Sequence, residues 1–341
     1  MTQWQSMLKG DSLSWLLEPD TENPAVRYLA LRDIVGLPQD SSELLEAKTK
    51  AMTTGTITAV LDNQRPTGYW VKPGGGYGPK YTGSVWSLVT LAQMGADKSE
   101  PRVRQAAAYL LDHTVSPVGW FSYNGTNSGF LHCHAGYLGA AMFALGFGDD
   151  LRVTAAIDWQ ARMITGEGIA EAGSEESARY YHYTTGPGFI CSANANKPCA
   201  WGAVKAMRAL GSVPGGQRTL AMDSAIDRGR QFLLNTDLTV CDFPTRDKTK
   251  ASGNWFKFGF PLLYVADLLE LIEVLTVLGG GGDLRLEKTW KLVLDKQDDQ
   301  GRWAMDYSYN GKLWSGIEVK GEPSKWVTLR VLRVLKRAFP N

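Results

Sequence analysis

Residues 189–210, FICSANANKPCAWGAVKAMRAL, decide the fold that we expect for this chain. Pro198 indicates the start of a helix, because proline is tolerated in a first turn, where its missing N–H has no intrahelical partner. Val204, Met207 and Leu210 follow at helical spacing, with alanines between them. This pattern predicts a helix with one apolar stripe and a flank of small residues, suited to close packing against neighbouring helices.

The same order of loop, inner helix and outer helix recurs along much of the chain. The inner helices are expected to begin near Ser84, His132, Pro198, Phe258 and Ser324. These uneven intervals argue against a solenoid of identical units and favour a closed ring of helical hairpins joined by loops of variable length. With the N-terminal helices included, and with no run of strand-like alternation, the sequence predicts an all-α fold. We expect a single (α/α)6 toroid domain over residues 1–341, with the loops before the inner helices gathered at one mouth.

Composition narrows the classes of function. The chain has 341 residues, of which 44% are hydrophobic and 21% charged, and a net charge of +1. This near-neutral balance predicts no nucleic-acid partner, and no stretch approaches the ~20 apolar residues of a membrane span. The first residues lack the pattern of a signal peptide, and the four cysteines are irregularly spaced. A cytoplasmic protein with reduced thiols is therefore expected, and a homo-oligomer stays open.

The run His132-Cys133-His134 stands at an expected helix start. At about 100° per residue, the two histidines point about 200° apart if both are helical. The positive end of the helix dipole favours neutral imidazole, the form that a general base or a metal ligand needs. His132 and His134 are therefore candidate catalytic residues, and a pair of hydrogen-bonded structural histidines is the alternative.

Cys191 and Cys199 flank the loop before the quoted helix. A thiol at a helix N-terminus is acidified, which favours a nucleophile, an acid/base group or a metal ligand. Both are candidate catalytic residues, although a buried cysteine also serves as a small hydrophobic residue. We expect His132, Cys191 and Cys199 to line one concave pocket at the mouth.

Aromatic and polar residues in the long loops are the candidate substrate-binding groups. Their clustering indicates a pocket lid, with simple packing of long loops as the alternative. The set is Tyr81, Tyr181, His182, Trp201, Trp255, Lys257, Phe258 and Asp267.

Two turns carry a family resemblance. Gln64-x3-Gly68-x-Trp70 and Gln297-x3-Gly301-x-Trp303 are similar to the QW turns of squalene cyclase and other class II terpene cyclases, and residues 117–120, PVGW, are similar to a degenerate third copy. The chain resembles the superfamily of terpenoid cyclase and protein prenyltransferase toroids over nearly its whole length. Through PCAWGAVKAMRAL, DKQDDQGRW and PSKWVTLRVLRVLK it is most similar to a bacterial branch of that superfamily. We interpret the turns as structural, because glycine permits the tight bend and tryptophan covers the end of a helix.

The resemblance implies a terpene-cyclase-like enzyme. Neither the DxDD acid motif of class II cyclases nor the DDxxD motif of class I synthases is present, which argues against classical squalene cyclisation. The expected activity is acid/base chemistry, an isomerisation, hydration, dehydration or cyclisation, on a small apolar or aromatic substrate in an aromatic-walled cavity.

Two alternatives remain. The first is a zinc-dependent transferase, because the toroid prenyltransferases bind zinc through Asp, Cys and His; the donors here would come from His132, His134, His182, Cys191, Cys199, Cys241 and Asp242. No cofactor is otherwise expected. The second alternative is a non-catalytic toroid that binds a ligand or a peptide.

Overall fold

The chain is mostly helical in the computed structural model, which describes residues 2–169, 185–246 and 252–340. The α-helices of this part are α1 (Ser12–Leu17), α2 (Pro24–Ala30), α3 (Ser42–Thr53), α4 (Gly55–Asp62), α5 (Ser84–Gln93), α6 (Pro101–Thr114), α7 (His132–Ala144), α8 (Leu151–Thr165), α9 (Ala200–Ser212), α10 (Leu220–Leu234), α11 (Leu268–Val277), α12 (Glu287–Leu294) and α13 (Lys325–Ala338). A π-helical turn, η2 (Leu31–Val35), extends α2. The all-α expectation is confirmed at this level.

Short strands pair the loops that precede the helices. They are β1 (Thr185–Gly186), β2 (Ile190–Cys191), β3 (Lys197–Pro198), β4 (Gly259–Phe260), β5 (Trp303–Ala304), β6 (Tyr307–Ser308) and β7 (Pro323–Ser324). The first three form an antiparallel sheet, β4 pairs with β6 in parallel, and β5 pairs with β7 antiparallel.

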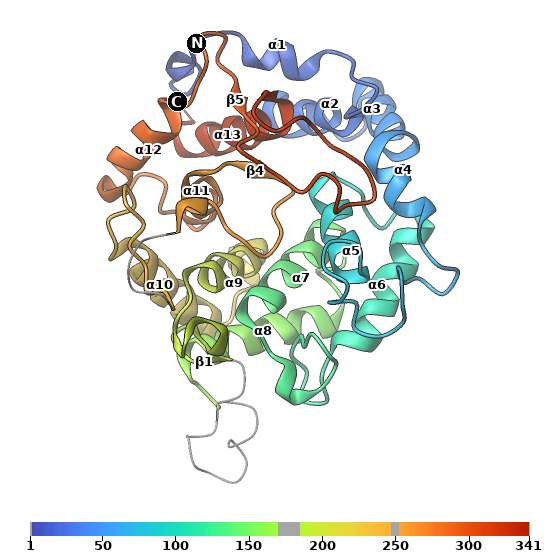
Figure 1. The fold of residues 1–341 in the computed structure, drawn as a ribbon, viewed down its shortest axis with the longest axis vertical. Helices are drawn as coiled ribbons and strands as arrows, with labels where there is room; N and C mark the ends of the chain where they lie inside the picture. The colour runs from blue at the N-terminus through green and yellow to red at the C-terminus, as the bar shows by residue number, and fades with distance from the viewer. Residues whose placement is uncertain (1, 170–184, 247–251, 341) are drawn as a thin grey trace.

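The alternate helices α5, α7, α9, α11 and α13 contact one another in series, and α13 in turn contacts α2. The first four are each followed along the chain by a partner on the outside, α6, α8, α10 and α12, so that the helices follow one another around the molecule (Figure 1). The apolar faces of these helices form one continuous core. In the described part of the chain, no helix is long and apolar enough to cross a membrane.

Three of the five expected inner-helix starts agree with the structure. α5 begins at Ser84, α7 begins at His132, and Ser324 caps α13 by accepting a hydrogen bond from the Val327 amide.

The other two expected starts are wrong. Pro198 lies in β3, opposite Ile190, and α9 begins only at Ala200. Phe258 precedes β4, and the next helix begins ten residues later, where Asp267 accepts a hydrogen bond from the Glu270 amide and caps α11. In both places strand pairing keeps the chain extended before the helix begins, with the adjacent strand β2 in the first case and with the distant strand β6 in the second.

The two Gln-x3-Gly-x-Trp turns are built alike. The indole of Trp70 donates to the Val60 carbonyl, and that of Trp303 donates to the Val293 carbonyl, each at 2.7 Å. Both rings are fully buried. Gly68 has a φ of +97°, and a Cβ there would lie 2.7 Å from the Gln105 carbonyl oxygen, so only glycine fits.

The second turn also holds the N-terminal segment in place. The Gln297 side chain accepts from the Lys9 amide at 3.0 Å and donates to the Met7 carbonyl at 3.1 Å. The hydroxyl of Ser12 donates to the Gly301 carbonyl at 2.5 Å. These bonds fasten the N-terminal segment to the turn that follows α12.

Candidate functional site

A cavity of about 580 Å³ lies among the inner helices. Residues of α5, α7, α9, α11, α13 and η2 line it, and in the five α-helices they come from the middle and the C-terminal half, except for Glu270 in the first turn of α11. Phe260 and Leu262, from the segment before α11, complete the wall. Most of the cavity lining therefore lies beyond the first turns of the helices, at which we expected the site.

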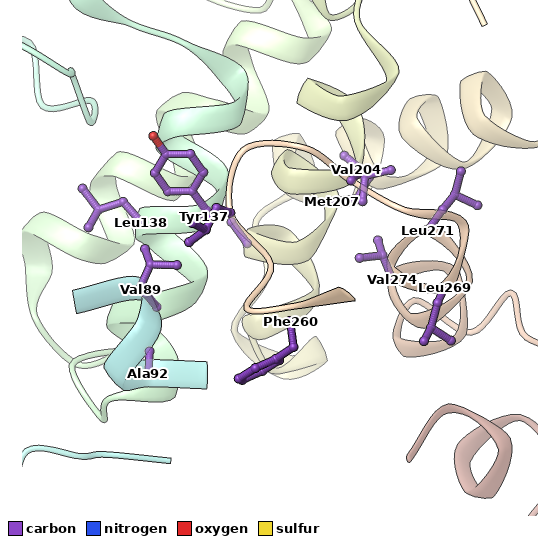
Figure 2. Close-up of a cluster of buried hydrophobic side chains, with 14 of the residues drawn as sticks. Val89, Ala92, Tyr137, Leu138, Val204, Met207, Phe260, Leu269, Leu271 and Val274 are labelled. Atoms are coloured by element: carbon purple, nitrogen blue, oxygen red, sulfur yellow. The ribbon is translucent and has the colours of Figure 1, made fainter. Parts of the chain in front are cut away.

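One wall of the cavity is apolar. Val89 and Ala92 of α5 lie beside Tyr137 of α7 (Figure 2). Ala140 and Ala141 continue this wall along α7. The alanines leave room where larger side chains would fill the space.

The opposite wall is charged. It is formed by residue pairs spaced three apart, which places both members on one helix face. The pairs are Lys205 and Arg208 on α9, Glu270 and Glu273 on α11, and Arg330 and Arg333 on α13. The expected aromatic-walled cavity is therefore replaced by one with an apolar side and an ionic side, to which Tyr137 and Phe260 contribute the aromatic rings.

A chain of ion pairs joins α9 to α11. The Lys205 ammonium lies 2.7 and 2.8 Å from the two carboxylate oxygens of Glu270, and both side chains are almost fully buried. Arg208 bridges Glu270 at 3.0 Å and Glu273 at 2.8 Å. Burial lowers the pKa of Lys205, and the charge of Glu270 opposes that shift. The pair thus places an acidified ammonium next to a carboxylate in the cavity wall.

Asp267, a candidate substrate-binding residue, is already engaged in a buried ion pair. Its carboxylate receives two hydrogen bonds of 2.8 Å from the Arg330 guanidinium, in addition to the capping bond from the Glu270 amide. Asp267 is only 5% exposed. This arrangement orients Arg330 and fixes the start of α11.

The candidate thiols do lie together. Cys199 caps α9, its Sγ accepting from the Gly202 amide at 3.4 Å, and Cys191 lies in the neighbouring strand β2. A hydrogen bond from the Cys199 thiol lowers the pKa of Cys191 to about 6, whereas the same bond raises the pKa of Cys199. Burial raises the pKa of Cys133 nearby to about 11, with the Cys191 charge adding to the shift. Cys191 is therefore the group that ionises first.

His132 lies close to Cys199, since a Cβ placed on Gly202 would lie 3.4 Å from the His132 Cβ and 3.8 Å from the Cys199 Sγ. Its Nε2 lies 3.0 Å from the Gly186 carbonyl oxygen, and its ring packs against Phe130 and Phe189. The ring is 3% exposed and is not part of the lining of the 580 Å³ cavity. A shared pocket for His132, Cys191 and Cys199 stays a prediction.

His134 lies in an aromatic cluster with Tyr77 and Tyr137, at ring distances of 5.9 and 5.5 Å. It is fully buried, and neither ring nitrogen has a hydrogen-bond partner among the described residues. Burial lowers the pKa of His134 to about 3 and that of His132 to about 4. Both imidazoles are therefore neutral, and the catalytic roles of the histidines and thiols stay predictions.

The other loop candidates pack at the N-terminal ends of the inner helices. Tyr81 lies 5.0 Å from Tyr309, Trp201 lies 6.5 Å from Trp255, and Phe258 is covered by the Lys296 ammonium at 5.1 Å. Lys257 is exposed. None of these lines the 580 Å³ cavity, and Tyr181 and His182 lie outside the described residues.

Of the expected zinc donors, Cys191 and Cys199 lie together, and His182 lies outside the described residues. Cys241 is buried with its thiol on the Leu238 carbonyl, and His132 is enclosed as described above. Within the described ranges, no group of three or more His, Cys, Asp or Glu residues is arranged to hold a metal ion.

Sequence reasoning missed the charged wall. Its signal is visible in otherwise apolar helices, as charged residues three apart in AWGAVKAMRAL, LLELIEVL and LRVLRVLKR. A charge costs several kcal/mol to bury without a partner, so such pairs indicate either ion pairing between helices or a polar cavity. Here they indicate both.

Comparison with known proteins gives limited likeness. No known protein family matches the chain, and no curated protein matches it. Among solved structures, a variant of the type II terpene cyclase MstE from Scytonema in complex with geranylgeranyl dihydroxybenzoate is similar, with 15% identity and a TM-score of 0.35 over 83% of this chain and 95% of that one. The unliganded MstE is similar with 13% identity and a TM-score of 0.32 over 83% of this chain and 96% of that one. A variant of a family 10 polysaccharide lyase from Cellvibrio cellulosa is similar with 14% identity and a TM-score of 0.32 over 68% of this chain and 80% of that one. Likeness at these TM-scores carries no argument about function.

Proposed function

We propose that the chain is a terpene-cyclase-like enzyme that performs acid/base chemistry on a small molecule held in the central cavity. The reaction is an isomerisation, hydration, dehydration or cyclisation, and the substrate presents an apolar or aromatic body to α5 and α7. The observation that carries this proposal is the 580 Å³ cavity with an apolar wall and, facing it, a buried Lys205–Glu270 pair.

The two halves of the wall have different tasks in this proposal. The small residues of α7 hold the hydrocarbon part by contact, because burying apolar surface is favourable at about 25 cal/mol per Å². The ammonium of Lys205 and the carboxylate of Glu270 exchange a proton with the bound molecule. The lowered pKa of Lys205 favours this role, since a proton leaves an acidified ammonium more readily.

The thiols remain a second proposed catalytic group. Neither Cys191 nor Cys199 lines the cavity, whereas Tyr137 does, and burial and the charge of Cys133 raise the pKa of Tyr137. Chemistry that involves Cys191 therefore requires the substrate to reach the N-terminal ends of the helices. Loss of conversion when Cys191 and Cys199 are replaced by alanine would support a catalytic role for the thiols. Full conversion would show that they serve only as packing residues.

The architecture that we propose around this site is a single (α/α)6 toroid over residues 1–341. It is supported by the serial contacts of the inner helices and by the bonds from Gln297 to the N-terminal segment. The cytoplasmic location and a homo-oligomeric state remain predictions.

The test is a conversion assay read by mass spectrometry. The protein is incubated with a panel of prenyl alcohols and prenylated hydroxybenzoates, and we expect a product whose mass is unchanged or differs by one water. Ala144→Trp, which places an indole at the cavity, should abolish conversion, whereas Ala108→Trp, an exposed alanine on the outer helix α6, should not.

Other results would favour the alternatives. A product that joins two substrates, together with stoichiometric zinc by elemental analysis, would favour the transferase. Binding of panel members without conversion would favour the non-catalytic toroid.

A further inference from the structure

The charged wall of the cavity carries more positive than negative charge. Its lining includes seven basic and three acidic side chains. Two of the basic groups, Lys205 and Arg208, are matched by Glu270 and Glu273. The excess therefore lies elsewhere in the wall.

Arg330 also has a carboxylate partner, because both of its terminal nitrogens donate hydrogen bonds of 2.8 Å to Asp267. What remains is concentrated where the last turns of α13 contact η2. There Arg32 and Arg333 share one carboxylate, that of Asp33.

Lys336 and the exposed Arg337 also line this part of the cavity and complete the group, which we call the basic corner: Arg32, Asp33, Arg333, Lys336 and Arg337. The Lys336 ammonium donates to the Asp33 and Ile34 carbonyls at 3.1 and 2.9 Å, so it is held in place without losing its charge. Neither Lys336 nor Arg337 has a carboxylate partner within residues 2–169, 185–246 and 252–340.

Compensation of helix dipoles does not account for the basic corner. The C-terminal end of a helix is equivalent to roughly half a negative charge, and its effect falls off within the last turn. The corner holds four basic groups and one carboxylate. A net excess of positive charge therefore remains in the cavity wall after the helix dipole and the Asp33 carboxylate are counted.

The excess is costly at Arg333, whose side chain is only 26% exposed. Burial lowers the pKa of Arg333, and the charge of Arg32 adds to the shift against the opposing effect of Asp33. The Arg333 Nε is buried and has no partner among the described residues. An anion within reach would offset both costs, because guanidinium groups bind carboxylate and phosphate oxygens through paired hydrogen bonds.

We propose that the basic corner binds an oxyanion, a phosphate ester or a carboxylate, carried by the small molecule that occupies the cavity. The inference rests on the proposed function only in taking the cavity as the binding site, and it names the class of ligand. The ligand is then two-sided, with its anionic group at α13 and η2 and its apolar body along α5 and α7.

The test is calorimetric binding of phenyl phosphate, with benzoate and phenol as matched ligands. We expect phenyl phosphate or benzoate to bind at least about tenfold more tightly than phenol, which corresponds to about 1.4 kcal/mol. Binding should weaken as salt is raised, because the contact is ionic. Which of the two anions binds more tightly identifies the oxyanion.

Variants locate the site. Lys336→Gln combined with Arg337→Gln should weaken anion binding about tenfold. The matched control Lys50→Gln, which removes one exposed positive charge from the outer helix α3, should leave it unchanged. Circular dichroism melting verifies that each variant is folded.

Three results would overturn the inference: phenol binding as tightly as the anions, no anion binding at all, or unchanged anion affinity in the double variant. If phenol binds and Ala144→Trp blocks it, the cavity stands as the ligand site and only the oxyanion inference fails.

Discussion

Replacing His134 by phenylalanine is expected to change the acid sensitivity of the protein. His134 is fully buried among aromatic rings, and burial lowers its pKa to about 3. An unfolded chain returns this pKa to about 6.5, so below that pH the unfolded state binds a proton that the folded state does not. Stability is therefore complete above pH 6.5 and is lost as the pH falls toward 3.

The expected magnitude follows from the pKa difference. At about pH 5, 1.5 units below the unfolded value, His134 costs about 2 kcal/mol at 1.36 kcal/mol per unit. His134→Phe removes this cost while the ring still fills the space. The variant should match the wild type at about pH 7.5 and exceed its free energy of unfolding by about 2 kcal/mol at pH 5.

Urea unfolding followed by circular dichroism at both pH values measures this. Tyr137→Phe is the matched control, since it alters a ring that packs on His134 but does not titrate in this range. A His134→Phe variant whose difference from wild type is the same at both pH values would refute the reasoning.

The remaining predictions concern the turn, the thiols and the buried ion pair. Trp303→Ala should cost about 3–5 kcal/mol, because it removes a fully buried ring; urea unfolding should show a clearly smaller loss for the half-buried Trp314→Ala, and equal losses would contradict the structural reading of the turn. Iodoacetamide should label Cys191 before the other thiols, since its pKa is lowered to about 6, and Cys199→Ala should slow that labelling near pH 6 by removing the bond that lowers it; peptide mapping that finds Cys241 labelled first would reverse this view. Glu270→Gln should destabilise the fold by about 3–5 kcal/mol by leaving Lys205 buried without a counterion, and the double change Lys205→Met with Glu270→Leu should recover most of that loss in thermal melts; a double variant as unstable as the single one would show that the pair does not act as a unit.

Local patterns predicted the elements whose causes are local. The Gln-x3-Gly-x-Trp turns were readable because a positive φ at Gly68 and a buried tryptophan follow from residue type. The starts of α5, α7 and α13 could also be predicted from the local sequence. The start of α11 could not, because Gly259 and Phe260 pair with Tyr307 and Ser308 in a distant loop.

The site was harder to predict because it depends on how the helices are rotated. Residues 205 and 208 lie next to an apolar stripe, and only the packing of α9 between α7 and α11 turns them toward the cavity. Cysteines and histidines drew attention by their chemistry, and two of the cysteines do lie together. Ordinary lysine, arginine and glutamate residues form the larger site.

The central claim is that the ligand binds in the cavity at the C-terminal halves of the inner helices rather than at the thiols. Hydrogen–deuterium exchange with and without phenyl phosphate tests it most directly. We predict slower exchange at the ends of α7, α11 and α13, around Ala144, Thr276 and Lys336, which line the cavity. Slower exchange confined to residues 186–202, around Cys191 and Cys199, would contradict the account.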